Sequence, residues 1–421
     1  MGEMKLVSKH VGLINPHDIN SYLIQGGYKE FHKAIKMDTI SIIEEIEYSR
    51  LRGRGGAGFP VSIKLMSLAK EEDPIKYVIC NADEGEPGNF KDRYLMENNP
   101  HQIIEGMLIA GYATRAHQGF IYIRGEYQNA ILMMQQAIDQ ATEKGFLNNP
   151  KEFLFSLEIR QGAGSYVCGE EFALLESIEG KPGRTRVKPP FPTQVGLFGK
   201  PTLINNVETF SCIPHILSMG GKNYAKLGTQ SSTGTKLISL SGNVKNRGVY
   251  EIEFGTTLRY VIEQLGGGVP EGRKIGMVQL GGACGPIIPE YMLDMMIDFE
   301  RFEQFESKTG SGAIIVIDDR FDMFDILMRV AEFFAHESCG KCTPCREGNI
   351  HLMNTLKRFT QYRATLSDMN SLESQAFVMH QTSLCGLGQT SPTAIISTLH
   401  YFRSQYTNRI YESMAKQQEA S

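Results

Sequence analysis

The chain has 421 residues, of which 41% are hydrophobic and 21% are charged, and its formal net charge is −4 at pH 7. This composition is typical of a soluble globular protein with several domains. The net negative charge does not favour a nucleic-acid binder or a membrane-surface binder. The sequence has no apolar run of roughly 18 residues that would predict a membrane span, and its start has no apolar signal core. We therefore predict a cytoplasmic, multidomain protein without direct membrane insertion.

The predicted elements divide the chain into four parts. Residues 1–58 contain short helices with a turn at Gly26 and Gly27. Residues 59–230 alternate strands such as KYVIC, GFIYIR and FSLEIR with helices, which predicts an α/β sheet covered by helices. Residues 231–320 have short strands around one helix, as in a small α+β unit. Residues 321–421 contain four helical segments and predict a bundle.

The stretch LRGRGGAGFP contains a G-x-G-x-x-G pattern at Gly53, Gly55 and Gly58. In a Rossmann dinucleotide site, a strand leads into the first glycine of this pattern. Here the preceding residues, DTISIIEEIEYSRL, have apolar side chains spaced as on one face of a helix. The clearest nearby strand, KYVIC, comes afterwards. The pattern therefore does not predict an ordinary Rossmann site.

A polar loop, CNADEGEPGNFKDR, follows the strand KYVIC. The carboxyl ends of strands are where open α/β sheets place ligands. A merely hydrophilic loop is the alternative, but a solvated loop does not need the glycines and the proline that fix this backbone. The candidate ligand-binding side chains are one amide and three carboxylates: Asn81, Asp83, Glu84 and Glu86.

Two further polar motifs follow predicted strands or turns. In GAGSYVCGEEFALLESIEG, the glycine-rich turn offers backbone N–H groups to a phosphate, whereas Glu170 and Glu171 are equally explained as acids in the first turn of a helix. In LINNVETF, Asn205 and Asn206 either bind the edge of a heterocycle or hold a turn. Neither motif decides a function alone.

The strongest signal is HESCGKCTPCREG, in which Cys339, Cys342 and Cys345 are each separated by two residues, and Cys385 follows much later. A C-x2-C-x2-C loop with one remote cysteine is the usual ligand set of a [4Fe–4S] cluster. Structural zinc, the alternative, normally uses two separated pairs. Cysteines at this density also indicate a reducing compartment. We expect the remaining cysteines to be small buried side chains: Cys80, Cys168, Cys212 and Cys284.

Taken in order, GRGGAGFP, NADEGEPGNFKDR, GAGSYVCGEE, INNVET and ESCGKCTPCREG resemble one family. It comprises the NADH-binding flavoprotein subunits of respiratory complex I and their soluble relatives, the diaphorase subunits of NAD-dependent or electron-bifurcating hydrogenases and of NAD-dependent formate dehydrogenases. The resemblance covers about Tyr22 to about Tyr406. It implies a Rossmann-like α/β domain for FMN and NADH, a ubiquitin-like (β-grasp) unit, and a C-terminal four-helix bundle with a [4Fe–4S] cluster.

The resemblance also implies roles for individual residues. The cluster ligands would be the four cysteines named above, and no catalytic residue is assigned because the flavin carries the chemistry. For NADH the residues are Phe59, Glu86, Glu171, Lys188 and Phe191. For FMN they are Gly53, Arg54, Gly55, Lys64, Asn81, Asp83, Glu84, Tyr166, Gly169, Glu170, Asn205 and Asn206.

The function implied is that of an NADH:acceptor oxidoreductase subunit in a hetero-oligomer. Hydride would pass between NAD(H) and FMN, and single electrons would pass through the cluster to a thioredoxin-like [2Fe–2S] subunit and a larger iron–sulfur subunit. Gly85 in NADEGEPG favours a soluble hydrogenase or formate dehydrogenase, whereas NFKDR is more similar to complex I. A non-catalytic scaffold and a zinc-stabilised binding module are alternatives of other classes.

One stretch departs from the family pattern. In FPVSIKLMS, Leu65 and Ser67 stand where the family usually has Trp and Phe. We expect one aromatic wall of the NADH pocket to be missing, which leaves the preference for NADH over NADPH open.

Overall fold

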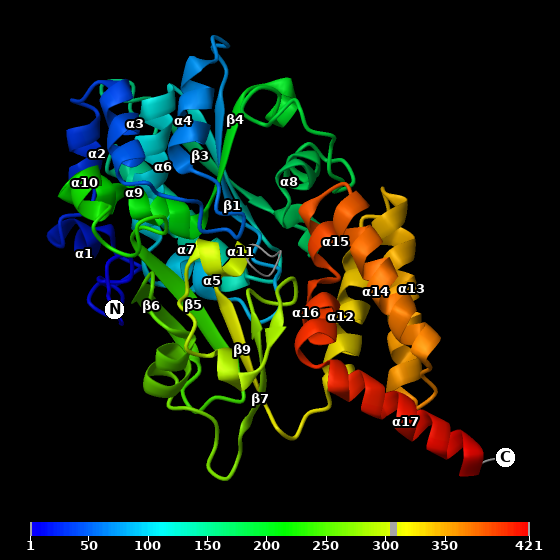
Figure 1. Ribbon diagram of the computed structural model, residues 1–421. Helices are drawn as coiled ribbons and strands as arrows, with labels where there is room; N and C mark the ends of the chain where they lie inside the picture. Colours follow the sequence, from blue (N-terminus) through cyan, green and yellow to red (C-terminus); the bar gives the residue numbers. More distant parts are fainter. Residues whose placement is uncertain (1, 304–309, 420–421) are drawn as a thin grey trace.

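The computed structural model describes residues 2–303 and 310–419 of the chain. Figure 1 shows two sheets, one above the other, and a helical C-terminal region beside them. Short helices come first, as predicted. A buried carboxylate, that of Glu105, holds this N-terminal region, because it accepts hydrogen bonds from the Tyr22 hydroxyl (2.5 Å) and from the Tyr28 backbone N–H (3.0 Å). The helices are α1 (Ile19–Ile24), α2 (Lys29–Ala34) and α3 (Thr39–Tyr48).

The first sheet has four parallel strands in the order β3-β2-β1-β4. Chain order runs outward from β1 to β3 on one side, and β4 returns to the other side of β1. The switch point of the sheet therefore lies between β1 and β4. The predicted strands are confirmed, whereas β4 was not predicted as a strand. The bounds are β1 (Tyr77–Ala82), β2 (Gln118–Ile123), β3 (Ser156–Gln161) and β4 (Thr202–Asn206).

Helices cover both faces of this sheet, as parallel strands buried on both sides require (Figure 1). The glycine loop lies between α3 and α4, so no strand leads into it, as the sequence predicted. The helices are α4 (Val61–Lys70), α5 (Lys91–Asn98), α6 (Pro100–Thr114), α7 (Gln128–Glu143), α8 (Glu171–Ile178), α9 (Val207–Met219) and α10 (Gly221–Tyr224), with 3-10 turns η1 (Tyr166–Gly169) and η2 (Leu197–Gly199).

The second sheet has the order β6-β5-β9-β7-β8. Strands β5 and β9 pair in parallel and the other pairs are antiparallel, which is the arrangement of a ubiquitin-like (β-grasp) unit. The elements are β5 (Thr235–Gly242), β6 (Gly248–Glu253), the π-helix η3 (Tyr260–Leu265), β7 (Ile275–Leu280), β8 (Ile287–Ile288), η4 (Glu290–Met292), α11 (Phe299–Glu303) and β9 (Ala313–Asp318).

The C-terminal region is helical, as predicted. Helix α12 buries Phe324, Leu327, Ala331 and Phe334, whose spacing of three or four residues forms one apolar face. The last predicted segment divides in two, because Phe402 leaves the helical conformation (φ −124°, ψ 27°). The helices are α12 (Met323–Glu337), α13 (Thr343–Thr360), α14 (Leu366–Thr382), α15 (Gly386–Thr390), α16 (Thr393–Tyr401) and α17 (Arg403–Glu419).

A buried carboxylate joins the two sheets. Glu208, in the first turn of α9, accepts hydrogen bonds from Nζ of Lys236 (2.5 Å) and from the Leu237 backbone N–H (2.8 Å), both in β5. Nζ of Lys91 lies 3.0 Å from the same carboxylate. The ubiquitin-like unit is therefore fixed against the end of β4. The four-part division at residues 58, 230 and 320 stays a prediction.

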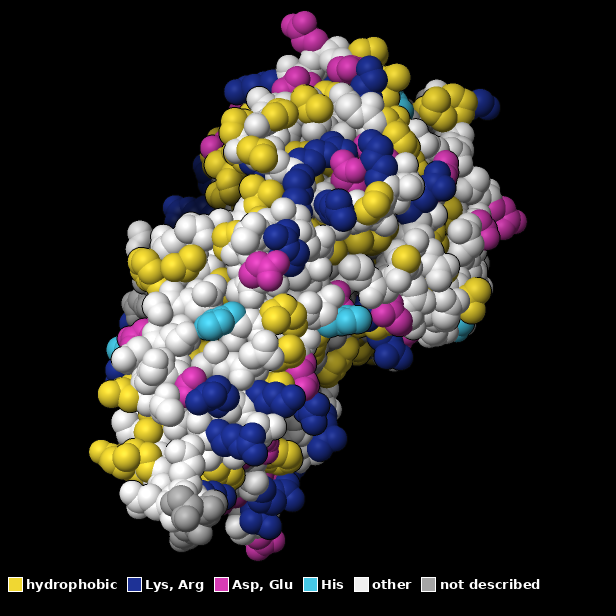
Figure 2. All heavy atoms as spheres, turned by 90° about the vertical axis from the view of Figure 1, so that its right-hand side faces the viewer, with side chains coloured by type: hydrophobic (Ala, Val, Ile, Leu, Met, Phe, Trp, Pro, Cys, Tyr) yellow, Lys and Arg dark blue, Asp and Glu magenta, His cyan; other side chains and the backbone are white. Residues whose placement is uncertain are grey.

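The face turned toward the viewer in Figure 2 mixes basic, acidic and apolar side chains, without one dominant sign of charge. Among the helices that the structure describes, none is long and apolar enough to cross a membrane.

Candidate functional site

The four predicted cluster ligands lie around one cavity. Cys339 follows α12, Cys342 and Cys345 begin α13, and Cys385 directly precedes α15. All four line the cavity, together with Val167 and other neighbours. The loop and the remote cysteine are thus brought together as the spacing predicted.

The donor set of this cavity fits an iron–sulfur cluster. Four thiols from two separate segments line it, three of them from one loop. Four thiolates are the usual ligands of a [4Fe–4S] cluster, whereas a structural zinc site normally draws its ligands as two pairs. Burial raises the pKa of the Cys385 thiol to about 11 and also raises the pKa of Cys345, so loading with iron must release thiol protons.

The second site lies at the switch point of the parallel sheet. Nδ2 of Asn81, at the end of β1, donates to the backbone oxygen of Gly169 in η1 (2.8 Å). A Cβ atom on Gly55 would lie only 3.1 Å from Cβ of Asn206, at the end of β4. The glycine loop, both strand ends and η1 therefore meet here, as expected for a ligand site in an open α/β sheet.

Two buried polar atoms at this edge fit a heterocyclic cofactor. Nδ2 of Asn205 and Oδ2 of Asp83 are buried and have no hydrogen-bond partner among the described residues. Burial raises the pKa of Asp83 to about 7. A buried polar group without a partner costs about 1–3 kcal/mol. A flavin ring offers the kinds of group that these two atoms lack, an N–H donor for the carboxylate and carbonyl acceptors for the amide.

The basic residues of the glycine loop region are placed differently from each other. Nζ of Lys64 donates to the backbone oxygen of Ile204 in β4 (3.1 Å), and burial lowers the pKa of Lys64. The guanidinium of Arg54 is buried and donates to the backbone oxygen of Thr233 (2.7 Å) and to the hydroxyl of Tyr224 (3.4 Å). Lys64 therefore lies against β4, whereas the Arg54 side chain binds Thr233 and Tyr224 in other segments.

A cluster of two lysines and two glutamates lies at the start of α8. Nζ of Lys188 is 2.5 Å from Oε1 of Glu171 and 3.1 Å from Oε1 of Glu170, and Lys64 is 3.9 Å from Glu171. The second oxygen of Glu170 accepts the backbone N–H groups of residues 172 and 173. Helix capping is thus part of the role of Glu170, as one of the two interpretations predicted.

The polar loop after β1 separates its two glutamates. Glu84 accepts the backbone N–H groups of Asp92 (3.0 Å) and Arg93 (3.1 Å) at the start of α5, and burial raises its pKa to about 7. The side chain of Glu84 therefore caps a helix. Glu86 instead accepts the hydroxyl of Tyr166 (2.6 Å) and the backbone N–H of Cys284 (3.0 Å).

Cys284 corrects one expectation. Cys80, Cys168 and Cys212 are buried, as predicted, but Cys284 is only partly buried and lies against Glu86. No spacing signal identifies it, because it is 198 positions away from its partner along the chain.

The structure also shows how exposed the aromatic residues predicted for NADH are, and where the two positions of α4 that depart from the family pattern lie. Phe59 and Phe191 are 46% and 51% exposed, so both rings offer free surface. Leu65, where the family usually has Trp, is fully buried in the core. Ser67 is partly exposed and lies one turn after Lys64. The expectation that one aromatic wall of the NADH pocket is missing stays a prediction.

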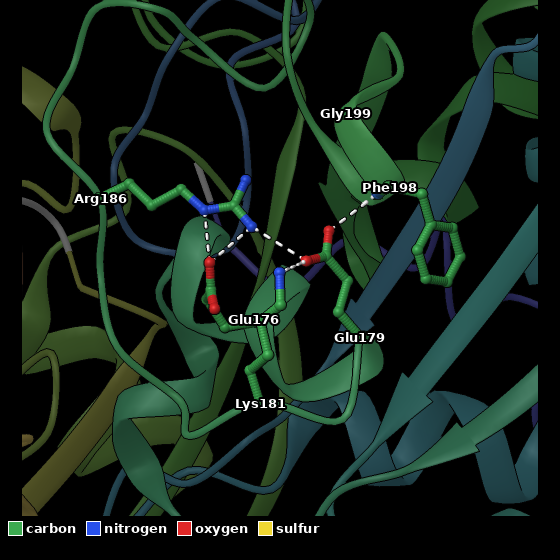
Figure 3. Close-up of a pocket in the computed structure, with 6 residues that line it drawn as sticks. All are labelled: Glu176, Glu179, Lys181, Arg186, Phe198 and Gly199. Carbon is green, nitrogen blue, oxygen red and sulfur yellow. Dashed lines mark hydrogen bonds and ion pairs between the residues drawn. The ribbon is translucent and has the colours of Figure 1, made fainter.

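A separate surface pocket lies near the other end of α8 (Figure 3). In it, Arg186 pairs with Glu176 (2.6 Å) and Glu179 (3.2 Å), and Lys181 pairs with Glu179 (2.7 Å). Its four charged side chains neutralise each other, so this pocket attracts neither anions nor cations strongly.

A parallel sheet with a glycine loop at its switch point, followed by a four-cysteine cavity in a helical region, defines a flavoprotein with an iron–sulfur centre. Family models match three regions: the Nuo51 FMN-binding domain at residues 46–215, the SLBB domain at 237–287 and the NADH-ubiquinone oxidoreductase-F iron-sulfur binding region at 325–409. The chain belongs to the family that comprises the F subunits of NADH-quinone oxidoreductases and their hydrogenase relatives.

Individual relatives come from both branches. The chain is 43% identical to the second F subunit of NADH-quinone oxidoreductase in Rhizobium meliloti, over 96% of this chain and 97% of that protein. It is 42% identical to the HndC subunit of the NADP-reducing hydrogenase in Solidesulfovibrio fructosivorans, over 96% of this chain and 83% of that protein.

A solved structure has the same fold. A crystal structure of an NAD+-reducing [NiFe]-hydrogenase in the H2-reduced state superposes with a TM-score of 0.81 at 36% identity, over 90% of this chain. The chain spans 64% of the length of that hydrogenase chain. The predicted family, fold class, oxidoreductase class, FMN and iron–sulfur centre are confirmed. The roles of individual residues toward FMN and NADH stay predictions.

Proposed function

We propose that this chain is the NADH-oxidising subunit of a hetero-oligomeric enzyme, and that it passes electrons from NADH through FMN to a [4Fe–4S] cluster held by the four cysteines. The observation that carries the proposal is the position of η1. Gly169 in this turn contacts Asn81 at the sheet edge, and Val167 in the same turn lines the cysteine cavity. The two sites are thus separated by one short turn.

The proposed residue roles follow the contacts described above. Bound FMN would accept hydride from NADH and release single electrons, which links a two-electron donor to one-electron carriers. Asn81, Asp83 and Asn205 would bind the flavin ring, and the N–H groups of the glycine loop and Lys64 would hold its phosphate. Glu84 supports the loop by capping α5, and Arg54 supports the glycine loop through its buried partners.

The NADH side would be formed by charged and aromatic groups. Phe59 and Phe191 offer exposed ring faces on which an adenine can stack. Glu86 and the Lys188–Glu171 pair present polar groups to the rest of the dinucleotide. We propose no general acid or base, because hydride transfer to a flavin needs close approach and alignment of the two rings.

Two assemblies compete. The soluble hydrogenase or formate dehydrogenase assignment is supported by Gly85 and by the likeness to an NAD+-reducing hydrogenase structure. A complex I assignment is supported by the match over 97% of the Rhizobium meliloti relative. We favour a soluble cytoplasmic complex, in which the partners are a thioredoxin-like [2Fe–2S] subunit and a larger iron–sulfur subunit. Affinity purification from native cells, with and without detergent, separates the two assignments.

An anaerobic titration with NADH, followed by absorbance and low-temperature EPR, tests the electron path. We expect the flavin absorbance to bleach and a reduced [4Fe–4S] signal to appear. If dithionite reduces the cluster while NADH and NADPH both leave the flavin oxidised, the chain is a scaffold that has lost dinucleotide binding. Zinc in place of iron in a metal analysis would refute the cluster.

A further inference from the structure

A loop of the ubiquitin-like unit enters the proposed NADH site. It connects β7 to β8 and comprises residues 281–285, GGACG, named here the 281–285 loop. The backbone N–H of Cys284 donates to Oε1 of Glu86 (3.0 Å). This contact joins the second sheet to the polar loop after β1.

The 281–285 loop is shaped around Glu86. Gly282 has φ +86°, and a Cβ atom on it would lie 2.2 Å from Cγ of Glu86. The thiol of Cys284 donates to the backbone oxygen of Gly281 (3.4 Å), which closes the loop on itself. Only glycine at position 282 leaves room for the glutamate in its present position.

A further contact of Glu86 comes from another part of the protein. Its second oxygen accepts the hydroxyl of Tyr166, whose ring packs against Phe333 of α12 (centroids 5.1 Å apart). Further along the same polar loop, Phe90 donates its backbone N–H to the Ser239 hydroxyl of β5 (3.0 Å). Both sheets and the helical region therefore fix one carboxylate, which is 8% exposed.

We propose that the 281–285 loop is a positioning element of the dinucleotide site, which holds the Glu86 carboxylate where it accepts the carboxamide N–H of the nicotinamide. This inference rests on the proposed function. The Cys284 thiol and the Ala283 backbone N–H also approach this carboxylate. Because the thiol can donate to the backbone oxygen of Gly281 instead, one of about four acceptor sites of the carboxylate stays available to the substrate. The ubiquitin-like unit thereby contributes to substrate recognition and not only to architecture.

The test compares two glycine substitutions in the complete FMN- and iron-loaded protein. Gly282→Ala forces the Glu86 side chain to move. Gly272→Ala, in the same unit, introduces similar backbone strain at φ +75° but meets no atom within 4 Å. Oxidation of NADH and of reduced 3-acetylpyridine adenine dinucleotide, whose ketone lacks the carboxamide N–H, is measured with ferricyanide as acceptor.

We expect Gly282→Ala to lower kcat/KM for NADH roughly tenfold, the effect of losing one hydrogen bond to a charged group, and to leave kcat/KM for the analogue nearly unchanged. Gly272→Ala should keep the wild-type ratio of kcat/KM for NADH to kcat/KM for the analogue, which is named here the NADH preference. In a Glu86→Gln background, Gly282→Ala should add little, because both changes act on the same contact. A Gly282→Ala protein that retains the NADH preference, or whose effect adds fully to that of Glu86→Gln, overturns the proposal.

A second variant covers the case in which Gly282→Ala does not fold. Cys284→Pro removes the donating N–H without adding bulk at position 282, and loss of the NADH preference is again expected. If it retains the preference, the positioning role is refuted. A wild-type protein that oxidises neither NADH nor the analogue refutes the proposed function itself, which is a different result from equal behaviour of the glycine variants.

Discussion

Lys188 bridges the two glutamates at the start of α8, with Nζ 2.5 Å from Oε1 of Glu171 and 3.1 Å from Oε1 of Glu170. The lysine reaches them from the proline-rich segment that follows α8. A single ammonium group thus joins a loop and a helix at the proposed NADH site, and it offsets negative charge that would repel the pyrophosphate of a dinucleotide.

Substituting Lys188 is therefore expected to weaken NADH binding more than it weakens folding. Lys188→Met leaves Glu170 and Glu171 without this partner, and we expect KM for NADH to rise about tenfold or more, in line with about 1.4 kcal/mol for a charged contact. Steady-state kinetics with ferricyanide measure the change. Lys181→Met is the matched control, because Lys181 also pairs with a glutamate, Glu179 at 2.7 Å, in the separate pocket of Figure 3. Equal effects of both variants would contradict this role.

Removing the remote cysteine should separate the two redox sites. We expect Cys385→Ser to lose or alter the [4Fe–4S] EPR signal and its iron content, since an alkoxide is a poor replacement for a thiolate at iron. The flavin should still bleach with NADH. Cys168→Ser is the control, because Cys168 adjoins Val167 at the cavity but does not line the cavity itself. An intact cluster signal in Cys385→Ser would exclude Cys385 as a ligand.

The buried carboxylate between the two sheets should matter for stability. Glu208→Gln leaves the Lys91 and Lys236 ammonium groups without their shared counter-ion, and breaking a buried pair of this kind typically costs about 3–5 kcal/mol. Glu263→Gln, which removes the exposed pair with Arg259, should change stability by at most about 1 kcal/mol. Thermal unfolding of the two variants measures the difference. A Glu208→Gln protein as stable as the Glu263→Gln protein would contradict the expected role.

One buried histidine predicts a loss of stability in acid. Burial lowers the pKa of His101 to about 4, from an ordinary value of 6.5 in the unfolded chain. The unfolded state therefore binds more protons between these two values, so stability is full above pH 6.5 and falls as the pH drops toward 4. We expect His101→Gln to make the dependence of the thermal midpoint on pH less steep in this range. His215, whose pKa burial lowers to about 3, keeps its own contribution. His400→Gln, at an exposed position, should leave this dependence as in the wild type. Identical curves for both variants would show that His101 is not responsible.

The sequence predicted most clearly those features that depend on local spacing. The cysteine loop, the helices of the C-terminal region and the first three strands of the parallel sheet follow from short-range patterns. Strand β4 was missed because it is short and ends in two asparagines, which are rare in strands. The capping role of Glu84 depends on where α5 begins, and therefore on the loop conformation.

The sequence alone could not predict contacts between segments that are distant along the chain. Nothing near Cys284 in the chain indicates that its backbone N–H meets Glu86, because that contact exists only after both sheets have assembled. The same holds for Lys236 and Glu208, which belong to different sheets. Arg54 is a further example. A basic residue in a glycine loop suggests a phosphate ligand, but the Arg54 guanidinium is buried and donates to the backbone oxygen of Thr233.

The turn η1 has a consequence for how this protein can change during evolution. Its four residues contact the sheet edge through Gly169, Glu86 through Tyr166 and the cysteine cavity through Val167. Because electron tunnelling slows exponentially with distance, an inserted residue that widened this turn would slow electron transfer even if every ligand of both cofactors were retained. Surface loops elsewhere can lengthen freely, but the length of this turn is constrained by the speed at which the enzyme must deliver electrons.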